Sequence, residues 1–414
     1  MSEMVVPDGW EIKQLDKFCD KVTDGTHDSP KRKNSGIRLV TSKNLLASGK
    51  LDLSSAYYIS EQDFVDIEKR SKVDVGDVIF GMIGTIGNPV VIYDLSVPFA
   101  IKNVALFKFS GDFDRARWVQ YYLDSDEFKL HIERSQTGNA QRFVGLGFLR
   151  NTIIPAPPIE EITKIASILT SVDEVIEKTQ SQINKLQYLK KGTMNELLTK
   201  GIGHTEFKDS PVGKIPVEWE VQEIESVINN LIDYRGKSPP KYSSGVPLLT
   251  AKNIRKGYID SEPREFIEED KFDSWMVRGI PTVGDVFFTT EAPLGNVALV
   301  PDYKFAIGQR VIALCPDVDK LNSVYLLYVL QGEIVKKQLF LDSTGSTVSG
   351  VKQSTFRKIL ILSPPLQEQQ KIASILSSMD THIEEKQRKL EQTQSLKKSL
   401  MQDLLTGKVR VTVH

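Results

Sequence analysis

The sequence predicts an α+β protein in which two globular domains of mixed α/β content alternate with two long helices. The chain has 414 residues, more than one hydrophobic core usually serves, so at least two domains are expected. A repeat divides it into two halves, each ending in a long helical pattern. Before each helix, runs rich in Val and Ile stand between Gly, Pro and Asn, which predicts strands at 78–80, 90–92 and 297–300.

The repeat is strongest in two segments of 45 residues. Residues 157–201 and 364–408 align without a gap at a constant offset of 207, and 22 of the 45 aligned positions are identical. Both copies contain the string KIASIL, which begins at Lys164 and again at Lys371. Two unrelated amphipathic helices need not agree over their whole length, so the identity indicates that one structural part is used twice.

Both segments read as long helices with an apolar seam. Each opens with Pro-Pro followed by acidic residues, which favour a helix N-terminus, and neither contains an internal Pro. Apolar positions recur in steps of three and four, as in a heptad repeat. A helix of about 40 residues is roughly 60 Å long, far more than one small domain needs, so the two helices are expected to pair. The candidate residues for helix pairing or partner docking are Ile165, Ile168, Leu169, Val172, Ile176, Ile183, Leu186, Leu197, Ile372, Ile375, Leu376, Met379, Ile383, Leu390, Leu400 and Leu404.

Identity between the repeats also extends to positions expected on the exposed face. Lys190-Lys191 in the first copy correspond to Lys397-Lys398 in the second. Packing of a core does not require such identity, so we interpret it as a sign of two equivalent binding surfaces.

The globular segments correspond more loosely than the helices. LVTSKN at 39–44 aligns with LLTAKN at 248–253, whereas the loops at 27–36 and 236–245 differ. The helices therefore do one job twice, and the domains do two versions of one job. Each domain is expected to close with a helix, around 118–132 or 324–339, then a Thr-Gly loop and a strand. The expected bounds are 1–157 for the first domain, 158–201 for the central helix, 202–364 for the second domain, 365–408 for the C-terminal helix and 409–414 for a tail.

Composition and motifs point away from a catalyst. The two cysteines, Cys19 and Cys315, are too few for a disulfide framework, and the five histidines lack metal-ligand spacing, so no metal site is predicted. No nucleotide-binding loop, nucleophile motif or methyltransferase motif is found. The chain has no predicted targeting or transmembrane segment, and we expect it in the cytoplasm.

Polar loops at matching positions of the two domains are the candidate DNA-binding sites. The net charge of −1 gives no bulk attraction for phosphates. Arg and Lys can nevertheless contact phosphate or guanine locally, and Asn and Gln can bond adenine. The candidate residues are Lys31, Arg32, Lys33, Arg38, Lys43, Asn44, Lys102, Asn103, Gln141 and Arg142 in the first domain, and Arg235, Lys237, Lys241, Tyr242, Lys252, Asn253, Arg255, Gln309, Arg310, Lys352 and Gln353 in the second.

Together these features make the chain resemble the specificity (S) subunit of type I restriction-modification systems. The resemblance rests on the twin PP-(x)5-KIASIL helices, the Thr-Gly loop and strand before each, the opening PDGWEIKQL and the linker GHTEFKDSPVGKIPVEWE. It covers nearly the whole chain.

The resemblance implies a non-catalytic subunit with two target recognition domains. Each domain would read one half of a bipartite, asymmetric site in double-stranded DNA. The family's two conserved helices would pair as an antiparallel coiled coil with pseudo-two-fold symmetry, set the spacer and dock two methyltransferase (M) subunits. Those subunits would bind S-adenosylmethionine and methylate adenine, and restriction (R) subunits using ATP and Mg would join them. No cofactor is expected in this chain.

Two other hypotheses remain open from the sequence. The chain could be a fused DNA methyltransferase or nuclease, or an assembly scaffold whose domains bind protein rather than DNA. A methyl-transfer assay on the chain alone separates the first from a specificity subunit, and an exchange of one domain separates the second.

Overall fold

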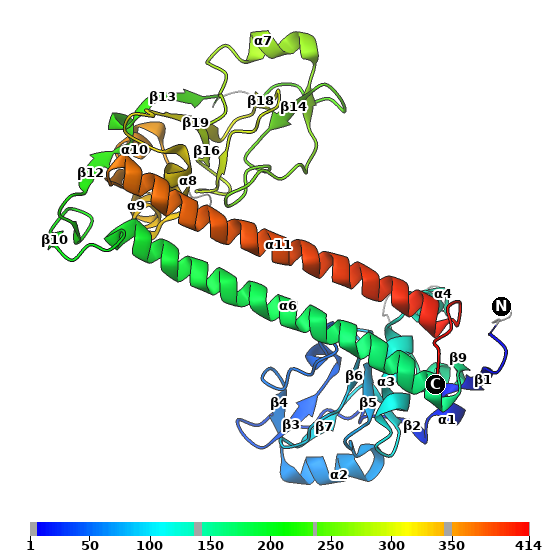
Figure 1. The fold of residues 1–414 in the computed structure, drawn as a ribbon. Helices are drawn as coiled ribbons and strands as arrows, with labels where there is room; N and C mark the ends of the chain where they lie inside the picture. The colour runs from blue at the N-terminus through cyan, green and yellow to red at the C-terminus, as the bar shows by residue number, and fades with distance from the viewer. Residues whose placement is uncertain (1–5, 136–142, 235–237, 343–349, 414) are drawn as a thin grey trace. The chain divides into compact units, whose positions relative to one another are not determined.

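The computed structural model describes residues 6–135, 143–234, 238–342 and 350–413 (Figure 1). The chain divides into two compact units: unit 1 comprises Met1–Gln180 and Arg388–His414, and unit 2 comprises Ser181–Gln387. Each unit contains one globular domain and one half of each long helix. Below, domain 1 denotes residues 6–156 and domain 2 residues 207–363.

The long helices are α6, Ile159–Lys200, and α11, Leu366–Leu405. Both begin directly after a Pro-Pro pair, because a residue that precedes proline disfavours the α conformation. The helix α6 is followed by Gly201, whose φ of +69° lies in the left-handed region that commonly terminates helices. A side chain at this position would also clash with Glu368 and Trp219, so glycine is required there.

Domain 1 contains three small sheets (Figure 1). Strand β1 pairs with β9, and the strand order β2-β8-β5-β6 forms an antiparallel sheet. In the third sheet, of order β4-β3-β7, β3 runs antiparallel to β4 and parallel to β7. The strand bounds are β1 Glu11–Gln14, β2 Lys21–Asp24, β3 Ile37–Val40, β4 Tyr57–Ile59, β5 Val78–Gly81, β6 Gly87–Val91, β7 Phe99–Ile101, β8 Val104–Lys108 and β9 Ile153–Ala156.

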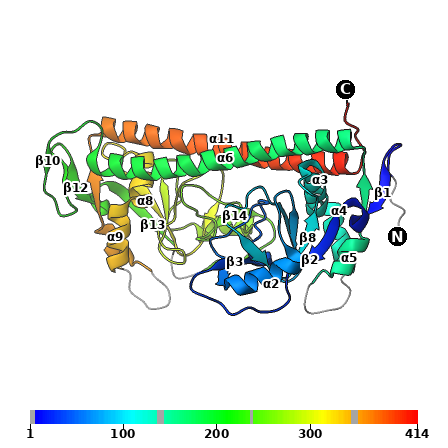
Figure 2. The same cartoon turned by 90° about the horizontal axis from the view of Figure 1, so that it is seen from below.

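Short helices cover these sheets (Figure 2). Helix α2 packs against β7 and α3 against β6. The helix bounds are α1 Leu15–Phe18, η1 Ser42–Asn44, α2 Glu61–Ser71, α3 Phe113–Asp124, α4 Asp126–Ser135 and α5 Leu146–Asn151.

Domain 2 repeats the topology of domain 1. Its sheets have the orders β12-β20, β13-β19-β16-β17 and β15-β14-β18, and β14 is parallel to β18 as β3 is to β7. A small hairpin, β10-β11, precedes them. The bounds are β10 Phe207–Lys208, β11 Ile215–Pro216, β12 Glu220–Glu223, η2 Ile224–Ser226, β13 Ile228–Asp233, β14 Val246–Leu249, β15 Phe266–Ile267, η3 Glu269–Lys271, α7 Phe272–Trp275, β16 Val286–Thr289, β17 Val297–Leu299, β18 Ala306–Ile307, β19 Val311–Pro316, α8 Ser323–Gln331, α9 Glu333–Asp342, α10 Gln353–Arg357 and β20 Leu360–Ser363.

The predicted strands are confirmed as β5, β6 and β17, but the closing helix of each domain is two helices. The predicted helix around 118–132 breaks at Ser125, which is extended and whose hydroxyl accepts a hydrogen bond from the backbone N–H of Phe128. The equivalent helix around 324–339 breaks at Gly332. Local capping by serine therefore competes with helix continuation at the first break. The Thr-Gly loops lie outside the described residues.

Apolar residues of both long helices belong to the cores of the domains. In unit 1, Ile165 and Leu169 of α6 lie in one buried cluster with Met401 and Leu404 of α11 and with Trp118 of domain 1. In unit 2, an equivalent cluster joins Ile372 and Leu376 of α11, Leu198 of α6 and the domain 2 core. The seam therefore joins each domain to one end of both helices.

Two of the KIASIL isoleucines, Ile165 and Ile372, were expected to pack against the other helix or against a partner subunit. Ile165 is 1% exposed and Ile372 is fully buried. Both fill the core of their own unit and cannot reach a partner without unfolding it. Other candidates of the seam, such as Ile168 and Val172, are only half-buried.

A glutamate near the start of each long helix holds it in place; Glu161 is buried and Glu368 is half-buried. Trp10 Nε1 donates to Glu161, which also accepts a hydrogen bond from Nε of Arg410 at 2.9 Å. In the second repeat, Trp219 Nε1 donates to Glu368 at 2.9 Å, and His204 Nε2 lies 2.9 Å from the same carboxylate. Each contact ties the start of one helix to the segment after the end of the other.

Replacing Ile165 with Ala should destabilise unit 1 by about 2–5 kcal/mol, because it leaves a cavity in a packed core. Chemical denaturation of the purified chain measures the change. Replacing Ser167, which is exposed on the same turn, with Ala is the control and should leave the stability within about 0.5 kcal/mol. Equal effects of the two substitutions would contradict the core position of Ile165.

Candidate nucleic-acid interface

The polar loops of domain 1 meet at one edge of its three-stranded sheet. Because β3 and β7 run parallel, the segments that follow them emerge at the same edge. Lys43 follows β3 in η1, and Lys102 and Asn103 follow β7. A backbone bridge between Thr26 and Lys102 brings His27 to this edge, where its Nδ1 lies 3.0 Å from Asn103 Oδ1. We call His27, Lys43, Lys102 and Asn103 polar edge 1.

Domain 2 forms the corresponding edge beyond β14 and β18. Lys252 follows β14, while Gln309 and Arg310 follow β18. The backbone N–H of Thr290 donates to the carbonyl of Arg310, and the next residue, Glu291, bridges to Gly350. Lys352 and Gln353 come just after this bridge. We call Lys252, Gln309, Arg310, Lys352 and Gln353 polar edge 2.

The turn after each parallel strand has the same unusual backbone. Asn103 has φ = 55° and Arg310 has φ = 70°, and the two positions are related by the repeat offset of 207. Such angles are uncommon for residues other than glycine and cost roughly 1 kcal/mol or more. Retention of this strain with two different side chains indicates that the turn serves to present a polar group.

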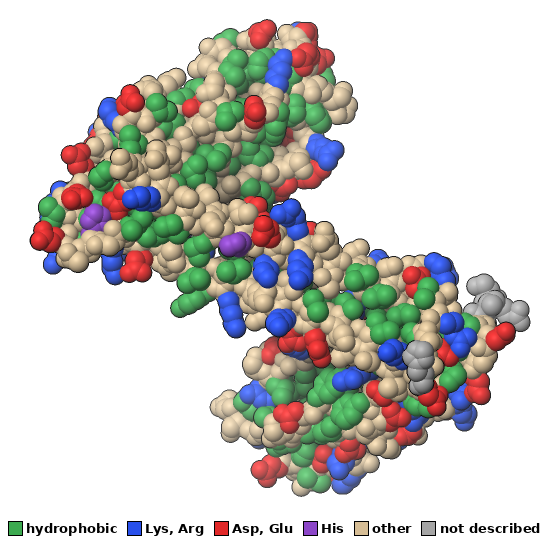
Figure 3. All heavy atoms as spheres, viewed as in Figure 1, with side chains coloured by type: hydrophobic (Ala, Val, Ile, Leu, Met, Phe, Trp, Pro, Cys, Tyr) green, Lys and Arg blue, Asp and Glu red, His purple; other side chains and the backbone are tan. Residues whose placement is uncertain are grey.

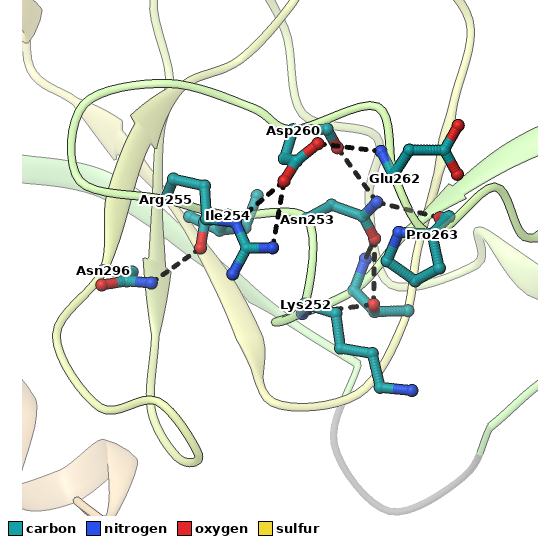
Figure 4. A network of polar contacts seen from close by, with 9 residues as sticks. Lys252, Asn253, Ile254, Arg255, Asp260, Glu262, Pro263 and Asn296 are labelled. Carbon is teal, nitrogen blue, oxygen red and sulfur yellow. Dashed lines mark hydrogen bonds and ion pairs between the residues drawn. The ribbon is translucent and has the colours of Figure 1, made fainter. Parts of the chain in front are cut away.

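Two of the three candidate asparagines, Asn44 and Asn253, make their hydrogen bonds inside their own loops. Asn253 Oδ1 accepts from the backbone N–H of Thr250 at 3.0 Å, and its Nδ2 donates to the carbonyls of Asp260 and Pro263 at 3.1 Å (Figure 4). Asn44 makes the equivalent bonds to Thr41 at 2.8 Å and to Ser55 at 3.0 Å. Both amides are at most 4% exposed, so neither is presented to a ligand in this structure.

Arg255 is also occupied within this loop. Its Nε and Nη2 lie 3.1 and 3.0 Å from Asp260 Oδ2 (Figure 4). The backbone N–H of Glu262 and the Arg255 guanidinium lower the pKa of the Asp260 carboxyl. The pair fixes one side of the guanidinium, and Nη1 of Arg255 makes no contact with Asp260.

Other cationic candidates lie beside β4, the outer strand of the three-stranded sheet in domain 1. A bridge between Lys33 and Tyr58 places the loop 31–33 beside β4. The Arg32 guanidinium lies 4.7 Å from the ring centroid of Tyr57, and that of Arg38 lies 4.9 Å from that of Tyr58. Lys31, Arg32 and Lys33 are exposed. The domain 1 candidates are therefore divided between the segments that follow β3 and β7 and the strands and loop around β4.

The corresponding segment of domain 2, beside β15, carries Lys241 and Tyr242. Lys241 Nζ lies 2.8 Å from the Glu265 carboxylate, and Tyr242 is 40% exposed. A bridge from Tyr242 to Phe266 corresponds to the one from Lys33 to Tyr58. The remaining candidates, Gln141, Arg142, Arg235 and Lys237, lie outside the described residues.

His27 belongs to polar edge 1 although the sequence reasoning did not select it. Its Nε2 lies 2.8 Å from Asp24 Oδ2, and Asp24 also binds the Arg70 guanidinium. The one available signal was its place in the divergent loop 27–36, where the aligned residue of domain 2 is Gly236. Its partners come from β2 and the turn after β7, which no local pattern connects.

Comparison with known proteins assigns both halves of the chain to one family. Residues 7–188 and 216–393 each match the family described as Type I restriction modification DNA specificity domain. The chain belongs to this family. The specificity subunit of the type I restriction enzyme MjaVIII from Methanocaldococcus jannaschii is 33% identical over 70% of this chain and 70% of its own length.

Two solved structures share the fold of this specificity subunit. The S subunit of a type I restriction-modification system from M. genitalium aligns with a TM-score of 0.60 at 13% identity, over 100% of this chain and 99% of that one. A chain from a structural study of complex assembly and conformational transition in a type I system aligns with a TM-score of 0.57 at 18% identity, over 98% of this chain and 100% of that one.

Neither cysteine of the specificity subunit is a reactive thiolate. Burial raises the pKa of the Cys19 thiol, and burial together with the Asp285 carboxylate raises that of Cys315 to about 12. Among the described residues, no group of three or more His, Cys, Asp or Glu is placed to hold a metal ion. Subunits of this family are non-catalytic and carry no catalytic cofactor of their own.

On the face drawn in Figure 3, both units carry positively and negatively charged side chains, with Lys and Arg lying among Asp and Glu. In the part of the chain that the structure describes, no helix is long and apolar enough to cross a membrane.

Replacing Asn253 with Ala should lower the free energy of unfolding of unit 2 by about 1–3 kcal/mol, because buried backbone groups lose their partners. Replacing its exposed neighbour Lys252 with Ala should change stability by less than about 0.5 kcal/mol. Chemical denaturation of both variants tests this. A stable Asn253→Ala protein that has lost DNA binding would contradict the structural role and restore the direct one.

Proposed function

We propose that each domain of this specificity subunit reads one half of a bipartite, asymmetric DNA site through its polar edge. The observation that carries the proposal is a shared framework with unlike side chains at matched positions. The strained turn presents Lys102 and Asn103 in domain 1 but Gln309 and Arg310 in domain 2. Lys and Arg suit phosphate or guanine, whereas Asn and Gln suit adenine. The two domains would therefore read two different half-sites.

We further propose that α6 and α11 pair as an antiparallel coiled coil over their full length. The support comes from each unit separately. In unit 1, Lys397 Nζ of α11 lies 2.7 Å from Asp173 of α6, and in unit 2, Lys190 of α6 pairs with Asp380 of α11. The residue numbers of each pair add to the same total, 570. One antiparallel register therefore satisfies both units with no break in either helix.

A pseudo-two-fold pair of this kind suits DNA recognition. Duplex backbones and two identical partner subunits have two-fold symmetry, so unlike recognition domains can share one frame. The length of the pair sets the distance between the half-sites and hence the spacer.

We propose that the duplicated outer face of the helices docks two methyltransferase (M) subunits. Leu189 and Leu396 are identical in the repeats and 56% and 53% exposed, so a core position does not explain their identity. The two repeats therefore offer the same apolar side chain at this equivalent position. Restriction (R) subunits would complete the assembly in the cytoplasm, with S-adenosylmethionine in M, and ATP and Mg in R.

Exchange of residues 10–150 for the same segment of a relative should change one half of the methylated motif and leave the other half intact. Long-read detection of methylated adenines in cells that express the chain with its M partner measures the motif. An unchanged motif would favour a protein-binding scaffold. Methyl transfer by the purified chain alone, without M, would favour an enzyme.

Replacing Leu189 and Leu396 with Asp should weaken assembly with M at least about tenfold, because a buried apolar contact becomes an unpaired charge. Size-exclusion chromatography of the mixed subunits measures assembly. The matched control is Tyr188→Ser, which changes an 83% exposed residue to the residue found at the aligned position, Ser395. Full assembly of the double variant would locate the docking face elsewhere.

A further inference from the structure

Three residues from three elements meet in a polar clamp in unit 1. The hydroxyl of Tyr121 on α3 donates to Asp173 Oδ2 on α6 at 2.8 Å. Lys397 Nζ on α11 lies 2.7 Å from Asp173 Oδ1 and 5.4 Å from the centroid of the Tyr121 ring. The clamp therefore joins domain 1, α6 and α11 through one carboxylate.

Unit 2 contains the same clamp with the roles of the helices exchanged. The hydroxyl of Tyr328 on α8 donates to Asp380 Oδ2 on α11 at 2.7 Å. Lys190 on α6 pairs with Asp380, and its Nζ lies 5.3 Å from the ring centroid of Tyr328. All three residues are related to their counterparts by the offset of 207.

The structure corrects our interpretation of one repeated lysine pair. Lys190 and Lys397 were expected to form part of two exposed binding surfaces, yet their side chains are only 20% and 21% exposed and point into the clamps. Their neighbours Lys191 and Lys398 are the exposed members of each pair. Identity at the first lysine therefore reflects an internal contact.

The clamps have a geometry that ordinary surface ion pairs lack. Each lysine is shielded from water by an aromatic face, and each carboxylate also receives a hydroxyl. Burial raises the pKa of both tyrosines, so their hydroxyls stay protonated as donors. By contrast, the Lys398–Asp126 pair has side chains 71% and 60% exposed, and such pairs contribute little.

Leu, Ile and Met in an apolar seam contact one another in several axial registers, whereas a directional polar contact is satisfied in only one. On α6, Asp173 and Lys190 are 17 residues apart, and on α11 Asp380 and Lys397 have the same separation. A slip of one helical turn, about 5.4 Å, would break both clamps together. That distance equals roughly one to two base pairs of duplex DNA, at about 3.4 Å each.

We propose that the two Tyr–Asp–Lys clamps determine the spacer length of the recognised site by setting the axial register of α6 against α11. The proposal rests on the proposed function, in which the helices separate two recognition domains. Lys190 and Lys397 are thus positioning residues for spacer specificity, although neither touches DNA.

The test replaces both clamp lysines with Met, which keeps the stem and removes the charge. Complexes of wild type, Lys190→Met/Lys397→Met and the control Lys178→Met/Lys389→Met, which changes two exposed lysines of α6 and α11 outside the repeated pairs, each with its M subunits, methylate a DNA library with both half-sites and a variable spacer. We expect the clamp variant to methylate spacers one base pair too short or too long about tenfold more than wild type, the change that a loss of about 1.4 kcal/mol produces. The control should keep the wild-type preference.

A second set of variants covers failure of the first to fold. Asp173→Lys with Lys397→Asp, together with Asp380→Lys and Lys190→Asp, inverts both ion pairs. This fourfold variant should show a narrower spacer preference than Asp173→Lys/Asp380→Lys alone.

The outcomes separate this proposal from the one on which it rests. An unchanged spacer preference in the methionine variant, even with a lowered Tm, would overturn the clamp proposal, as would failure of the charge inversion to narrow the preference. If the wild-type complex methylated no bipartite site at all, the proposed function itself would be wrong.

Discussion

The architecture depends on one constraint: neither long helix can bury its apolar stripe against a single domain. Helix α6 has 42 residues, or about 63 Å, whereas a domain of this size spans only part of that length. Domain 1 buries Ile165 and Leu169 near one end of α6, and domain 2 buries Leu198 near the other. Helix α11 completes both cores, with its C-terminal end in unit 1 and its N-terminal end in unit 2. Folding of each unit therefore requires segments from both halves of the chain.

Repetition made much of this fold predictable. The offset of 207 located α6 and α11 within a residue or two of their ends, apart from the end of α11, which stops three residues before the predicted limit. Runs of Val and Ile located strands, because β-branched residues are enriched in strands and these strands are buried along most of their length. The breaks at Ser125 and Gly332 were missed, since capping by one residue competes with a periodicity that continues across it.

The site was less predictable, because a repeat shows which positions are equivalent but not where their side chains point. Asn44 and Asn253 recur because their side chains hydrogen-bond within their own loops. Lys190 and Lys397 recur because they form ion pairs between the two helices. The positions that differ between the repeats, such as Asn103 and Arg310, are the better candidates for reading DNA. Equivalence indicates framework, and divergence on a shared framework indicates specificity.

The clamp also limits how freely recognition domains can be exchanged. Tyr121 belongs to domain 1, whereas Asp173 and Lys397 belong to the helices, so an incoming domain must supply a ring and a donor at the position of Tyr121. It must also present a face that accepts Ile165 and Leu169. The residues of polar edge 1 follow β3 and β7 or belong to the loop after β2, so they lie in other segments of the chain than the residues that contact the helices. The loops that follow the parallel strands can therefore diverge, while α3 is held by the helices it must fit.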